Sequence, residues 1–288
     1  MICTRRDSAA ASGLRALCHR LAAGMLLAAA FAAPAAAEDL FDTSILRGSL
    51  GSGPVRWDGV VMGAQIGYSS MDSDFGNSTQ SQIAYILRNS SLESEFHPDQ
   101  WTTLPHDLTS TQSFGIFLGY NTQWDDLVLG ADIAYNRLQK LQPSASDSIA
   151  RTVTLDDGTV DAVTINASSS IKLIDYSTFR GRAGWAFGQF LPYALFGGAV
   201  GRFNYTNSST VTVLQTPTVG PPSTFGPVTQ TDSQSNKFGY GYLWGFGMDV
   251  AITPNMFLRG EWEYIAFSKV GDISSSLNTV RVGLGVRF

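Results

Sequence analysis

Large apolar residues alternate with small or polar residues along much of this chain. From Phe238 to Ile252 every second residue is large and apolar, whereas four of the residues between them are glycine. A helix repeats every 3.6 residues, so it cannot carry eight large side chains with a period of two on one face. The segment is therefore predicted to be a β-strand with one apolar face and one small or polar face.

The same alternation recurs seven more times and predicts eight strands in all. In residues 191–205, the apolar face is expected to hold Tyr193, Leu195, Ala199 and Phe203, opposite Gly198 and Arg202. Each segment has the length that a tilted strand needs to cross a bilayer. The predicted strands are residues 57–69, 112–121, 127–139, 172–187, 191–205, 238–252, 258–266 and 278–288.

Connections between these segments differ sharply in length. Three are tight, at residues 122–126, 188–189 and 253–255, whereas the other four are residues 70–111, 140–171, 206–236 and 268–276. The long connections are rich in Ser, Thr, Asn, Gln and Pro, which predicts flexible, solvated loops. Transmembrane barrels combine short periplasmic turns with long extracellular loops in this way.

Charges concentrate on the face opposite the large apolar residues. A charge on a lipid-facing surface costs about 2–4 kcal/mol at the bilayer midplane, so the near absence of charge on the apolar face favours lipid contact there. A soluble barrel or β-sandwich, the alternative, would carry its charges outside. The charges expected in the lumen, as a network, are Asp132, Arg180, Arg182, Arg202, Asp249, Arg259, Glu261, Glu263, Arg281 and Arg287.

These features together predict an all-β fold, an eight-stranded antiparallel up-and-down transmembrane β-barrel. Aromatic residues near the strand ends are expected to form girdles at the two membrane interfaces. The girdle residues are Trp57, Tyr68, Tyr120, Trp124, Tyr135, Tyr193, Tyr205 and Tyr240.

The first residues predict export. Four arginines precede the apolar run 21–33, Pro34 interrupts it, and three alanines before Glu38 resemble a cleavage site. We therefore expect a signal peptide at 1–37, a periplasmic lead-in at 38–56 and the barrel at 57–288. Both cysteines, Cys3 and Cys18, fall in the signal peptide, so the exported chain has no thiol for a disulfide or a thiolate metal site.

The composition of the chain argues against two further classes of protein, those that bind nucleic acid and those that cross a membrane with helices. Taking the signal segment's four Arg and one Asp from 19 basic and 24 acidic residues leaves 15 and 23, a formal charge of −8. This balance argues against nucleic acid as a partner, because phosphate contacts need Lys and Arg. After Pro34 no run approaches 18 apolar residues, which excludes a helical membrane protein.

Several motifs resemble those of the opacity-type, OmpA-like small outer-membrane β-barrels of Gram-negative bacteria. They are the W-x-G-x-x-x-G-x-x-x-G-Y pattern at 57–68, Phe-Arg-Gly-Arg-Ala-Gly at 179–184, Pro-Tyr-Ala at 192–194 and Val-Gly-Leu-Gly-Val-Arg-Phe at 282–288. The resemblance implies a bacterial outer-membrane location and roles in envelope structure, as a surface antigen or in host contact. It also implies that the barrel-insertion machinery recognises the C-terminal strand through Phe288.

Candidate catalytic and metal-binding residues are few. His97 and His106 both lie in the first long connection, where Asp99 or Asp107 could complete a metal site, but solvated histidines are the simpler interpretation. The segment 72–77 is similar to a calcium loop, yet Ile83 occupies its twelfth position, where a Glu ligand is required. Glu261 and Glu263 are interpreted as partners of lumen arginines rather than as an acid–base pair. No metal, cofactor or enzymatic activity is predicted.

Two functions follow from this architecture. The first is a barrel for envelope structure and surface contact, whose lumen is plugged by the Arg/Asp/Glu network and whose long loops bind host or environmental surface ligands. The alternative is a small porin or channel for ions or small solutes. Water-filled channels usually have 16 or more strands, so eight strands favour the plugged barrel. A third and weaker hypothesis, an enzyme, would need a catalytic histidine, and none falls on a predicted strand.

Overall fold

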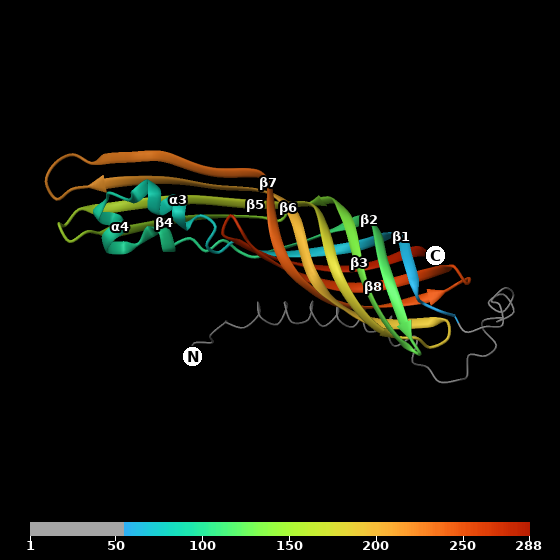
Figure 1. The fold of residues 1–288 in the computed structure, drawn as a ribbon. Helices are drawn as coiled ribbons and strands as arrows, with labels where there is room; N and C mark the ends of the chain where they lie inside the picture. Colours follow the sequence, from blue (N-terminus) through green and yellow to red (C-terminus); the bar gives the residue numbers. More distant parts are fainter. Residues whose placement is uncertain (1–54) are drawn as a thin grey trace, which may run out of the picture. The chain divides into compact units, whose positions relative to one another are not determined.

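Eight antiparallel strands close into a ring in the computed structural model, which describes residues 55–288 (Figure 1). The hydrogen-bonded order is β3-β2-β1-β9-β8-β7-β6-β5, and pairing of β3 with β5 closes it. The predicted signal peptide and residues 38–54 of the predicted lead-in lie outside the described residues. The ring strands are β1 (Gly59–Asp74), β2 (Asp107–Trp124), β3 (Leu127–Leu141), β5 (Val160–Trp185), β6 (Phe190–Thr216), β7 (Ser223–Ala251), β8 (Met256–Val270) and β9 (Ile273–Arg287).

The register around the ring fixes the tilt of the strands. A row of paired residues starts at Phe238 on β7, passes through Arg202 on β6, Arg137 on β3 and five further strands, and returns to β7 at Met248, ten residues further on. Eight strands with this shift must tilt by about 40° from the barrel axis, which is usual for closed barrels. The interior of such a ring is just wide enough to be filled by side chains.

A band of exposed apolar side chains surrounds the ring, as the alternation predicts. On β2, for example, Ile116 and Leu118 are 62% and 53% exposed, whereas Phe117 between them is buried. Among the girdle residues, Tyr68, Tyr120, Trp124, Tyr135 and Tyr240 are also exposed. Trp57, Tyr193 and Tyr205 are buried instead, so the prediction was wrong for these three.

The predicted faces of β6 are reversed in the structure. Tyr193, Leu195, Ala199 and Phe203 point inward and are buried, and Phe196 on the other face is 68% exposed. Arg202 therefore lies on the outward face, not in the lumen. The reason is that both faces of this strand are apolar along the barrel, so that alternation alone does not distinguish them.

Two of the long connections are strands rather than flexible loops. Strands β5, β6 and β7 contain 26, 27 and 29 residues and continue beyond the ring, where β4 (Ser144–Thr154) pairs with β5 (Figure 1). We call this four-stranded part, residues 144–170 and 206–233, the external sheet. Its Thr and Val residues favour strands, and along β5 and β6 every second side chain is buried.

The connection from β1 to β2 covers one face of the external sheet. It contains α3 (Gln80–Leu87), α4 (Ser91–Phe96) and the 3-10 turn η1 (Pro98–Gln100). Ile83, Leu87 and Leu92 form an apolar core with Val163 and Val211 of the sheet. The connection was predicted to be a flexible loop, but this second core makes it a packed part of the structure. Within residues 55–288, no helix has the length and apolarity needed to cross a membrane.

Two substitutions on the outward face of β2 test the apolar band. We expect Leu118→Arg to lower the free energy of unfolding in lipid vesicles by about 2–4 kcal/mol, because it places a charge near the middle of the lipid-facing surface. The control Gln112→Arg, near the margin of the band on the same face, should cost about 0–1 kcal/mol. Denaturant titration monitored by tryptophan fluorescence measures both, and equal costs would contradict a lipid-facing band.

Candidate functional site

Eight charged side chains gather inside the ring, and each is at most 5% exposed. They come from the inward-facing positions of β3, β5, β7, β8 and β9. We call them the buried charge cluster. Its members are Asp132, Arg180, Arg182, Asp249, Arg259, Glu261, Glu263 and Arg281, which are eight of the ten residues that the sequence predicts as a lumen network.

The strand register places three pairs of opposite charges face to face. Asp132 lies opposite Arg180, Asp249 opposite Arg259, and Glu261 opposite Arg281 on neighbouring strands. Arg180 Nε is 2.6 Å from Asp132 Oδ1. The fork of Arg259 meets both oxygens of Asp249, with Nε at 2.9 Å and Nη2 at 2.8 Å. Bidentate pairing of this kind is the strongest geometry for an arginine and a carboxylate.

Further contacts connect these pairs across the interior. Arg180 Nη1 of β5 lies 2.9 Å from Glu261 Oε2 and 3.1 Å from Glu263 Oε2, both on β8. Arg281 of β9 donates a hydrogen bond to Glu263. Arg182 Nη1 is 3.4 Å from Asp249 Oδ2. Because β7 and β6 lie between β8 and β5 in the ring, these contacts cross the interior and tie non-adjacent strands together.

The cluster balances its charges and contains uncharged partners. It holds four guanidinium groups and four carboxylates, so its formal charge is zero. Tyr193 Oη lies 3.1 Å from Asp249 Oδ1 and 2.8 Å from Glu261 Oε1, and Asn121 Oδ1 accepts hydrogen bonds from Arg182. A Cβ at Gly247 would lie 2.6 Å from the Tyr193 oxygen, so glycine makes room for this contact.

Apolar layers lie on both sides of the charges. Near the short turns, Phe257 packs against Trp57 and Phe117, with ring centroids 6.2 Å apart in each pair. The Arg259 guanidinium stacks on Phe117 at 4.1 Å from its centroid. Near the external sheet, Phe203 meets Phe267 edge-on, beside the buried Leu243 and Ile265. Side chains thus fill the interior on both sides of the charge cluster.

The two other predicted network residues lie elsewhere. Arg202 is on the outward face, where its side chain is 38% exposed and forms an ion pair with Asp175. Arg287 donates to the carbonyl of Pro254 and lies over the Trp57 ring at 5.3 Å. Phe288 is 75% exposed and donates its backbone N–H to Val60 O. Tyr193 and Asn121 were not predicted as partners of these charges, although the alternation along β2 places Asn121 on the inward face.

The histidines of the first connection separate into two groups. His106 lies 3.8 Å from Asp72 and 3.6 Å from Asp74, whereas potential ligand atoms of Glu93, His97 and Asp99 all lie within 4.8 Å of one another. Burial, reinforced by the charge of Asp99, raises the pKa of Glu93. His97 thus lies with Glu93 and Asp99 rather than with His106, in a partly exposed group of a kind that is common without a metal.

Comparisons with known proteins place these features in context. The family model described as the outer membrane protein beta-barrel domain matches residues 23–288. The chain is similar in structure to Ail, the attachment invasion locus protein of Yersinia pestis, with 16% identity over 80% of this chain and 99% of that one and a TM-score of 0.35. It is also similar to OprG from Pseudomonas aeruginosa, with 11% identity over 80% and 96% and a TM-score of 0.36. No curated protein matches the sequence.

Unpairing one charge tests the balance of the buried cluster. We expect Glu263→Gln to lower the free energy of unfolding by about 3–5 kcal/mol, because Arg180 and Arg281 lose a buried partner. The double variant Glu263→Gln, Arg281→Gln should cost less than the sum of the two single variants, because it restores neutrality. Denaturant unfolding in detergent micelles measures these values.

The half-exposed pair on the outward face provides the control. Arg202→Gln should cost no more than about 1 kcal/mol, since its ion pair with Asp175 is partly solvated. A cost for Glu263→Gln as small as that for Arg202→Gln would show that the buried charges are not mutually dependent.

Proposed function

Because the chain belongs to the outer-membrane β-barrel family, we propose that it is a non-conducting barrel of the bacterial outer membrane that presents its external sheet at the cell surface. Its roles would be envelope structure and surface contact. The protein lies in the outer membrane, with lipid around its apolar band. The proposed roles require no catalytic residue and no cofactor.

The filled interior supports a closed barrel. Arg180 reaches from β5 to Glu261 and Glu263 on β8, and the neutral cluster lies between two apolar layers. An ion that entered would lose hydration and would have to separate paired charges, which is costly in a medium of low dielectric constant. This arrangement is the observation on which the non-conducting role chiefly depends.

The external sheet supports a role in surface contact. It is built on three strands of the ring, so the barrel holds it rigidly, and α3 packs on it through a core of its own (Figure 1). Binding residues are often placed on elements that a rigid scaffold positions. We further propose that the last strand, β9 with Phe288, is recognised during insertion; Phe288 lies in the outward row of Val280, Val282, Leu284 and Val286.

Reconstitution in planar lipid bilayers tests the closed barrel. We expect no stable conductance steps from the purified, folded chain, because side chains of the cluster bridge the interior. Heat-modifiable migration on gels confirms that the sample is folded before the recording. Reproducible steps whose size changes in Arg259→Gln or Glu261→Gln would refute the proposal and identify a channel through the cluster.

A further inference from the structure

The outward face of β6 changes its chemistry in three zones between the short turns and Thr212, below the exposed Leu214 near the tip of the external sheet. The first zone is apolar, the second is the single cation Arg202, and the third is polar and uncharged. In order along the strand, the outward residues are Phe190, Pro192, Ala194, Phe196, Gly198, Val200, Arg202, Asn204, Thr206, Ser208, Thr210 and Thr212. The apolar zone belongs to the lipid-facing band, so the other two zones continue from the surface that meets the membrane.

Three basic residues form a group at the margin of the apolar band. Arg137 and Arg202 lie on either side of Asp175 in one row of paired residues, and Lys172 pairs with Asn204 one step beyond. Asp175 binds Arg202 and accepts a hydrogen bond from Tyr135 at 3.1 Å. Three cations against one anion leave this outward-facing group positive, although the whole chain is acidic.

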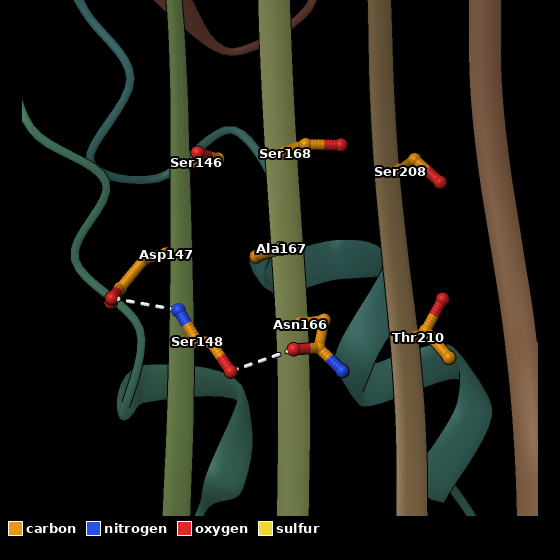
Figure 2. A pocket seen from close by; sticks show the side chains of 8 residues that line it. All are labelled: Ser146, Asp147, Ser148, Asn166, Ala167, Ser168, Ser208 and Thr210. Carbon is orange, nitrogen blue, oxygen red and sulfur yellow. Dashed lines mark hydrogen bonds between the residues drawn. The ribbon is translucent and has the colours of Figure 1, made fainter.

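Beyond the basic group, the external sheet carries a regular array of hydroxyl and amide side chains. Three paired rows each cross β4, β5, β6 and β7, and we call these twelve residues the hydroxyl array. The rows are Ser144–Ser170–Thr206–Ser233, Ser146–Ser168–Ser208–Thr231 and Ser148–Asn166–Thr210–Thr229. Figure 2 shows part of the last two rows around a shallow hollow, with the helices on the other side of the sheet.

Neighbouring strands bind one another through these side chains. Thr206 and Ser233 oxygens are 3.0 Å apart, Ser208 and Thr231 are 3.1 Å apart, and Thr210 and Thr229 are 2.8 Å apart. At the edge of the sheet, Asp147 accepts a hydrogen bond from the backbone N–H of Ser148. The bonds hold the hydroxyls in place, yet each hydroxyl oxygen can still accept, and several can donate, a further hydrogen bond.

The composition of the array indicates which class of ligand fits it. None of the twelve residues is aromatic or apolar, so the array lacks the core of a typical protein–protein interface and any affinity for acyl chains. Ordered groups that both donate and accept hydrogen bonds complement the hydroxyls of a sugar. The adjoining cations complement a phosphate. Along β6 the order apolar, cationic, hydroxylated matches acyl chain, phosphate and sugar in a phosphorylated glycolipid.

We propose that the hydroxyl array and the basic group together bind the headgroup of a phosphorylated glycolipid in the outer leaflet around the barrel. Arg137, Lys172 and Arg202 bind its phosphates, and the array binds its sugars. This inference rests on the proposed surface-contact role of the external sheet. It does not depend on closure of the lumen, so binding and conductance experiments can fail independently.

The phosphate contacts are tested with charge-neutralising variants of the full chain folded in detergent micelles. The probe is detergent-dispersed lipopolysaccharide that carries a phosphorylated lipid anchor and core sugars, and calorimetry measures Kd. We expect Arg137→Gln and Lys172→Gln to weaken binding about fivefold per charge removed. The matched control, Arg88→Gln with Arg151→Gln, removes two exposed cations that lie over Tyr85 and Trp101 in the helix-covered part and should leave Kd unchanged.

The sugar contacts are tested with a second set of variants and a second probe. Ser168→Ala, Ser208→Ala and Thr210→Val together should weaken binding of the complete glycolipid by about fivefold per hydrogen bond lost. The same variant should bind the phosphorylated anchor without sugars as tightly as the unaltered protein does. Ser81→Ala with Ser94→Ala, on α3 and α4, is the control for the loss of hydroxyls elsewhere.

Three results would overturn the proposal. One is an unchanged Kd in both sets of variants. Another is an equal loss of affinity in the Arg88, Arg151 control, which would show non-specific attraction of anions. The third is an equal effect of the array variant on both probes, which would exclude contact with sugars. Heat-modifiable migration of every variant separates loss of binding from loss of folding.

Discussion

Closure of the sheet is the constraint on which the rest of this structure depends. Backbone N–H and C=O groups that face lipid must be paired within the protein, and a closed ring of strands leaves none of them at an open edge. Eight strands with a ten-residue shift then fix both the tilt and the width of the interior. Whatever points inward must fill this narrow space and balance its own charge, because little water reaches it.

The interior satisfies both requirements with few residue types. Large side chains alternate with glycine across the ring: a Cβ at Gly285 would lie 2.3 Å from the Phe257 ring, and Gly247 makes room for Tyr193. Four arginines form ion pairs with four carboxylates on adjacent and more distant strands, so the net charge of the interior cluster is zero. An interior filled in this way makes the barrel a rigid support, and the variable chemistry of the molecule is carried by the external sheet.

Period-two alternation predicted the barrel because lipid and lumen impose opposite polarity on successive residues. It assigned the faces of β8 and β9 correctly, because each strand has charges such as Glu261, Glu263 and Arg281 on one face and apolar residues on the other. It reversed β6, because Tyr193 and Leu195 are as apolar as Phe196 on the opposite face. It missed the external sheet, because strands exposed to water on one face carry Ser and Thr and are similar in composition to loops.

The sequence predicts which residues form the buried charge cluster better than it predicts how they pair. Whether a side chain points inward depends only on its position in the alternation along its own strand, so most members of the cluster can be identified from the sequence of each strand. The partners of Arg180 depend instead on the shift around the whole ring, which brings Glu261 and Glu263 of β8 within reach of β5. The pairing of Arg202 with Asp175 depends on a register irregularity after Leu173, and no sequence pattern marks it.

The three zones of β6 also relate position along this strand to height above the acyl chains of the membrane. On a strand tilted by about 40°, each step of two residues rises by about 5 Å along the barrel axis. The length of chain between Val200 and Thr206 therefore sets the height of the hydroxyls above the acyl chains, independently of how the tip is folded. Evolution could raise or lower the external sheet by adding residues to β6 and its neighbours in pairs, since a single added residue would exchange the two faces.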